Sequence, residues 1–60
     1  MTATGFERAL QENAQEWFSG RKTYETFHKD AMAIWDRIEQ ANLAEPVLKM
    51  VRAKIDRVQP

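Results

Sequence analysis

The sequence predicts an all-α fold, a small three-helix bundle, and three observations lead to this prediction. Apolar residues recur three and four positions apart, which is the period of an amphipathic helix. No stretch alternates with the period of two that a half-buried strand requires. The chain has 60 residues and few glycines or prolines to interrupt the periodic segments, so we expect residues 1–60 to form a single helical domain.

A first helix is predicted over residues 5–19. Thr4 and Glu7 are three positions apart and have the form of a capping box, in which a hydroxyl and a carboxylate bond early amides. Gly20 would end the helix, because glycine adopts the left-handed conformation at little cost. The face that this helix would bury carries Phe6, Leu10, Asn13, Ala14 and Trp17.

A second helix is predicted over residues 24–41, with Thr23 as its N-cap. It is the longest and most apolar segment, so we expect it to be the central helix. Trp35 widens its apolar seam on one side, and His28 lies beside Tyr24 and Trp35 at helical spacing. The seam itself comprises Tyr24, Phe27, Ala31, Ile34, Ile38 and Ala41.

A third helix is predicted over residues 44–58. Asn42 with Glu45 three positions later is a second candidate capping box. Leu48 belongs to its apolar stripe, with Val47 at the edge of that stripe. The full stripe is Leu48, Val51, Ile55 and Val58. The connections between the three segments are short, which favours antiparallel neighbours.

Small size predicts a partner. A chain this short buries only about 60% of the surface that its unfolded form exposes. It has no cysteine and a single histidine, so neither a disulfide nor the usual structural zinc site is expected, and no cofactor motif is present. We therefore favour an open arrangement completed by self-association over a self-sufficient bundle.

The charges balance over the whole chain but not along it. Nine cationic residues match nine anionic ones, whereas nucleic-acid-binding modules of this size are usually basic. Residues 1–20 hold three Glu against one Arg, and residues 43–60 hold four cations against two anions. The third helix could present a basic surface to a phosphate backbone or an acidic partner, or it could pack against the acidic first helix. The basic-surface candidates are Lys49, Arg52, Lys54 and Arg57.

Sequence-specific DNA reading is disfavoured by the start of the third helix. A recognition helix needs polar or cationic side chains in its first turn to contact base edges. Residues 44–48 read Ala-Glu-Pro-Val-Leu, which is apolar and acidic. Any contact of this helix with nucleic acid would therefore be driven by phosphates and not by sequence.

The surplus of apolar and aromatic side chains on the helix flanks indicates a protein-interaction surface. Trp17, Tyr24 and Phe27 have the spacing of core residues, whereas the remaining candidates lie at the margins of the apolar faces. Protein-interface candidates are Phe18, His28, Met32 and Trp35. We interpret His28 as a packing residue and not as a catalyst, because no nucleophile or orienting triad partner is placed with it.

These patterns together predict a small non-enzymatic protein-interaction module of bacterial or phage type, with an inhibitor, antitoxin-like or assembly-adaptor role. Its partner would be a second copy or a larger protein, and no small-molecule substrate or membrane is expected. The alternatives are a nucleic-acid-associated regulator that uses the basic third helix, and a purely structural oligomerisation element. No apolar run approaches the ~20 residues of a membrane span, and no signal-peptide pattern occurs, so a cytoplasmic location is expected.

Overall fold

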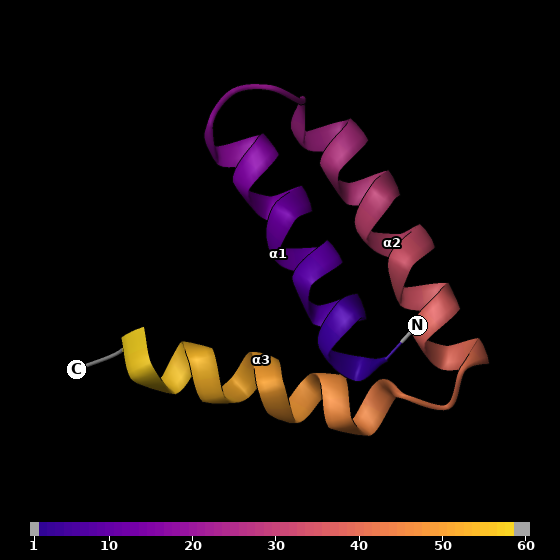
Figure 1. Ribbon diagram of the computed structural model, residues 1–60. Coiled ribbons are helices and arrows are strands. Elements are labelled where there is room, and N and C mark those ends of the chain that lie inside the picture. Colours follow the sequence, from indigo (N-terminus) through magenta and orange to yellow (C-terminus); the bar gives the residue numbers. More distant parts are fainter. Residues whose placement is uncertain (1, 59–60) are drawn as a thin grey trace.

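The computed structural model describes the backbone of residues 2–58 and the side chains of residues 2–55. This part of the chain forms three helices, α1 (Ala3–Phe18), α2 (Tyr24–Gln40) and α3 (Ala44–Val58). α1 and α2 lie side by side as an antiparallel hairpin, and α3 runs across its open end (Figure 1). The predicted all-α, three-helix class is therefore confirmed.

Helix α1 begins two residues earlier than predicted. The hydroxyl of Thr2 accepts a hydrogen bond from the amide of Gly5 at 3.2 Å, so Thr2 is the N-cap. The predicted capping box of Thr4 and Glu7 is wrong, because Thr4 already lies within the helix and Glu7 is buried against α3. Thr2, two positions upstream of Thr4, is the threonine that caps the helix, although no Glu follows it three positions later.

The α1–α2 turn forms as predicted. Gly20 has a φ of +81°, the left-handed conformation that ends a helix, and the amide of Arg21 donates to the carbonyl of Glu16 at 2.8 Å. Thr23 is the N-cap of α2, and its hydroxyl accepts from the amide of Thr26 at 3.2 Å. Local sequence signals therefore define both ends of this connection.

The α2–α3 turn differs from the prediction. Asn42 has a φ of 58° and ends α2 in the left-handed conformation, which asparagine tolerates better than most residues. The amide of Leu43 donates back to the carbonyl of Ile38 at 3.0 Å, and the carbonyl of Leu43 accepts from the amide of Val47 at 3.1 Å. The predicted capping box of Asn42 and Glu45 is therefore wrong.

The core is one junction where the three helices meet. Phe6 of α1, Ile38 of α2 and Val47 of α3 are buried there. Val47, predicted at the edge of its stripe, is fully buried, whereas Leu48 is 45% exposed. α3 crosses the hairpin and does not lie along it. The hairpin therefore covers Val47, whereas the neighbouring Leu48 lies at the margin of the contact. Partly buried residues around the junction are Ala3, Leu10, Ile34, Trp35, Leu43, Ala44 and Val51.

The resulting molecule is flat. Its Cα atoms extend over 33 × 30 × 14 Å, with a radius of gyration of 11.8 Å. A globular domain of this length is expected to have a radius of gyration of about 10 Å. The crossed placement of α3 therefore leaves apolar helix faces outside the junction. Completion of this arrangement by a second copy stays a prediction.

Shortening a side chain at the junction will destabilise the fold. We expect Ile38→Val to lower the free energy of unfolding by about 1 kcal/mol, because it removes one methylene from a fully packed site. Urea denaturation followed by circular dichroism measures this change. Ile55→Val removes the same group from a side chain that is half exposed in the single chain. It should cost less than half as much in dilute solution, where chains do not associate. Equal losses would contradict the assignment of the core.

Candidate functional site

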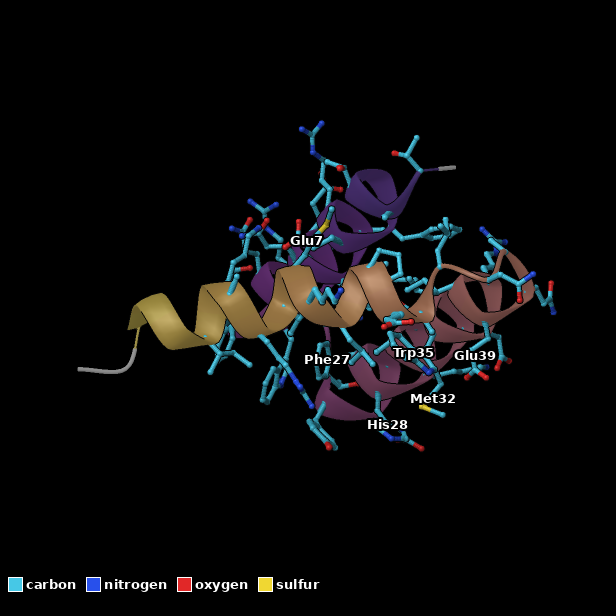
Figure 2. All side chains as sticks on the ribbon, turned by 90° about the horizontal axis from the view of Figure 1, so that it is seen from below. Glu7, Phe27, His28, Met32, Trp35 and Glu39 are labelled. Carbon is cyan, nitrogen blue, oxygen red and sulfur yellow. The ribbon has the colours of Figure 1, made fainter. Side chains whose placement is uncertain are left out.

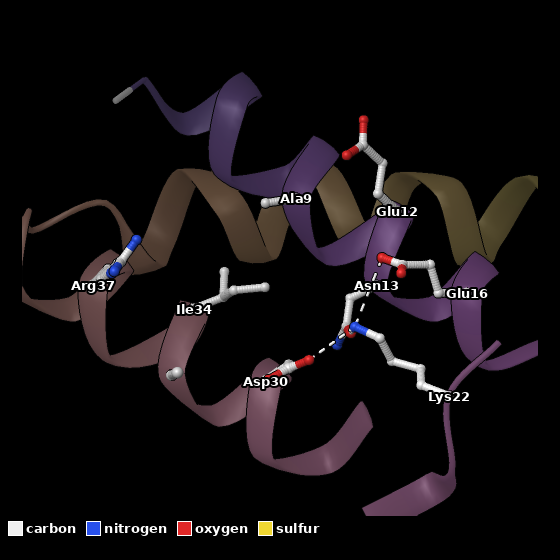
Figure 3. A pocket seen from close by; sticks show the side chains of 9 residues that line it. Ala9, Glu12, Asn13, Glu16, Lys22, Asp30, Ile34 and Arg37 are labelled. Atoms are coloured by element: carbon white, nitrogen blue, oxygen red, sulfur yellow. Dashed lines mark hydrogen bonds and ion pairs between the residues drawn. The ribbon is translucent and has the colours of Figure 1, made fainter. Parts of the chain in front are cut away.

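A polar network closes the α1–α2 hairpin (Figure 3). Asn13 of α1 is buried, and its Nδ2 donates to the carbonyl of Phe27 in α2 at 3.0 Å. Its Oδ1 accepts from Nζ of Lys22 at 2.6 Å, and the same Nζ contacts Oδ2 of Asp30 at 2.8 Å. The network therefore joins α1, the turn and α2 through directional bonds, which set the register of the hairpin.

The ammonium group of Lys22 is the centre of this network. Its hydrogen bond with Asp30 raises the pKa of Lys22, and attraction to the Asp30 and Glu16 carboxylates adds to the effect although burial opposes it. Glu16 lies 3.6 Å from Nζ. The network borders a cleft of about 310 Å³ between the two helices. Asn13, Lys22 and Asp30 bond one another, so we assign these groups to the closure of the hairpin.

An aromatic cluster lies at the turn end of the same hairpin. Trp17 stacks on Phe27, with ring centroids 4.7 Å apart and an interplanar angle of 14°. Tyr24 packs edge-on against Trp17 at 5.3 Å, and Phe18 lies 4.9 Å from Trp17. Phe18 and Tyr24 remain 79% and 58% exposed. Trp17 and Phe27 therefore form the packed base of the cluster, and the rings of Phe18 and Tyr24 form its exposed outer layer.

The cluster continues along α2. The rings of Tyr24 and His28 are 6.0 Å apart, and Met32 and Trp35 follow at helical spacing. Figure 2 shows His28, Met32 and Trp35 on the same side of the molecule. Met32 is 53% exposed, and Trp35 is partly buried against the core. We name this surface the aromatic strip, comprising Trp17, Phe18, Tyr24, His28, Met32 and Trp35.

The aromatic strip brings together all four residues that the sequence nominated as interface candidates. Phe18 comes from α1 and is joined to the α2 residues through Trp17 and Tyr24. Sequence reasoning assigned Tyr24 to the core, and this assignment is wrong. Tyr24 is the first residue of α2 and stays exposed because it lies at the turn end of the hairpin, opposite the end that α3 covers (Figure 1). The position of Tyr24 directly after the N-cap Thr23 was the sequence signal that could have indicated its exposure.

The basic-surface candidates fall into different environments. Nζ of Lys54 forms an ion pair with buried Glu7 and a hydrogen bond with Oε1 of Gln11 at 3.2 Å, so it bridges α3 to α1. Lys49 and Arg52 are exposed. Arg57 lies outside the described side chains. The Lys54 bridge is a contact of the kind expected if the basic third helix packs against the acidic first helix.

Among the described residues, no three His, Asp or Glu side chains lie close enough to hold a metal ion. No helix in residues 2–58 has the length and apolar content needed to cross a membrane. Comparison of the chain with protein-family models, curated proteins and solved structures finds no match. The function of the chain is therefore inferred from its own residues.

Loss of the Lys22 charge will weaken the hairpin in a pH-dependent way. The pKa of Lys22 is raised in the folded chain above its ordinary value of 10.5, so its contribution to stability is complete below that pH and is lost as pH rises through the raised pKa. We expect Lys22→Met to lower the urea midpoint at pH 7 and the difference from wild type to shrink at higher pH. Lys29→Met, at an exposed position, is the control and should show neither effect.

Removing Lys54 will cost more than removing the charge of Glu7. Lys54→Met leaves a buried carboxylate without its cation, whereas Glu7→Gln leaves an exposed ammonium that water solvates. We expect Lys54→Met to lower the free energy of unfolding by about 1–2 kcal/mol, given the partial exposure of the pair. The double variant should recover part of that loss. A larger loss for Glu7→Gln would contradict this account of the contact.

Proposed function

We propose that the chain is a small non-enzymatic protein-interaction module that docks through the aromatic strip onto a larger protein. The observation that carries this proposal is the exposure of Phe18, Tyr24 and Met32. Phe18 and Tyr24 are joined through Trp17, and Met32 follows Tyr24 along α2 at helical spacing. Exposed apolar patches on small proteins mark binding sites, and aromatic side chains supply most binding hot spots. The partially covered base of the strip holds these anchors in place before docking.

The mode of recognition would be a helix face laid into an apolar groove. Side chains at helical spacing along α2 provide the anchors, as in other helix-in-groove complexes. Tyr24 and Phe18 are rigid and lose little conformational entropy on binding, while Met32 is flexible enough to fit an irregular surface. Exposed charges beside the strip, such as Lys29 and Glu39, would set specificity more than affinity.

An inhibitor, an antitoxin-like protein and an assembly adaptor all use this mode of action, because each works by covering a surface of a larger molecule. We propose a cytoplasmic setting for this action. The chain has no cysteine, so its fold does not depend on an oxidising compartment where disulfides form.

Matched aspartate variants test this function. The tagged chain is used to capture proteins from its native host, and each captured protein is then purified and titrated directly. We expect Met32→Asp to weaken binding about tenfold or more, because a carboxylate is placed in the apolar contact. Ala33→Asp introduces the same group at an exposed neighbouring position a third of a turn away and should bind like the wild type.

Equal binding by the two variants would overturn the assignment of the strip, provided that circular dichroism shows both to be folded. Met32 is a cleaner probe than Trp35, which also packs against the core. A salt titration separates the nucleic-acid alternative. Binding driven by phosphates falls steeply between about 50 and 200 mM salt, whereas an apolar interface hardly responds.

A further inference from the structure

A second apolar surface lies in the angle between α1 and α3. α3 runs past the hairpin, so its C-terminal half diverges from α1 (Figure 1). A cavity of about 220 Å³ opens in this angle, lined by Leu10 of α1 and by Val51 and Ile55 of α3. We name it the α1–α3 crook. Its rim consists of Glu7, Gln11 and Lys54.

The chain exposes more surface than a monomer of its size should. Its accessible surface is 4885 Å², whereas a folded monomer of 7.0 kDa is expected to expose about 4,000 Å². The excess of roughly 900 Å² is close to the ~800 Å² that each partner buries in a stable protein–protein interface. The chain therefore leaves enough surface uncovered for an interface of standard size.

The charges of the crook define the chemistry of its occupant. The carboxylate of Glu7 and the ammonium of Lys54 pair with each other, and Gln11 bonds the same ammonium. The rim thus offers no unpaired charge of one sign to a nucleic acid or to an acidic peptide. A partner that binds in the crook must therefore present apolar side chains, and it gains no attraction from an unpaired charge on the rim.

The chain itself carries a segment that meets this requirement. The part of α3 that extends past the hairpin presents Ile55, which is 50% exposed at the mouth of the crook. Ile55 therefore belongs both to the lining of the crook and to the exposed end of α3, so the same patch on two copies can meet across a two-fold axis. The net charge of the chain is zero, so two copies do not repel each other as wholes.

We infer that a second copy of this chain docks in the α1–α3 crook. The α3 helix of each copy lies in the crook of the other, and Ile55 of one copy packs against Leu10 of its neighbour. Figure 2 shows Glu7, on the rim of the crook, on the opposite side of α3 from His28 and Met32 of the aromatic strip. The dimer therefore leaves His28 and Met32 of the strip free, and the inference stands or falls independently of the proposed function.

Light scattering with matched glutamate variants tests the inference. At about 100 μM chain, well above a micromolar Kd, the wild type should have twice the 7.0 kDa mass of one chain. Ile55→Glu places a carboxylate in the crook and should give a monomer. Ala53→Glu places the same group at an exposed position on another face of α3 and should stay dimeric. A monomeric wild type, or an Ile55→Glu variant that stays dimeric, would overturn the inference.

A cross-linking measurement decides the matter if Ile55→Glu does not fold. The chain has no cysteine, so single cysteines can be introduced without background. Chains with Gln11→Cys are mixed with chains with Ile55→Cys and oxidised mildly. Reciprocal docking predicts a mixed disulfide that forms much faster than with Ala33→Cys in place of Gln11→Cys. Equal rates for the two mixtures would overturn the inference.

Discussion

The architecture depends on a single junction to which each helix contributes one buried side chain. Phe6, Ile38 and Val47 contact one another there, and the Glu7–Lys54 ion pair gives α3 a second attachment to α1. Because the junction is small and α3 crosses the hairpin, several apolar residues farther along the helices stay exposed, among them Phe18, Met32 and Ile55. The exposed surfaces on which both proposals rest follow directly from that geometry.

Within the hairpin, a polar contact determines where apolar groups lie. Asn13 bonds the carbonyl of Phe27, so the two helices cannot slide past each other without leaving buried polar atoms unpaired. This register places Trp17 on Phe27, and Tyr24 then lies against the outer edge of Trp17. A buried amide therefore positions the base of the aromatic strip more than a turn of helix away.

Helical periodicity was sufficient to predict the three helices and two of the three core residues, because amphipathic spacing reports which face is buried. It misplaced Val47 and Tyr24, since burial at the margin of a face depends on the angle at which helices cross. Asn42 fits both a helix start and a helix end, and only its backbone conformation distinguishes them. Lys22 lies in a loop with no periodic signal, so its part in the network could not be predicted from spacing.

The two attachments of α3 differ from the hairpin contacts in their separation along the chain. Asn13 and Phe27 are 14 residues apart, whereas Glu7 and Lys54 are 47 residues apart. Loop-closure entropy makes the nearer contacts form sooner, so we expect the hairpin to assemble before α3 docks against it. During that interval the apolar surface beneath α3 is bare. A partly folded chain of this kind exposes the apolar side chains of the junction and is prone to aggregate.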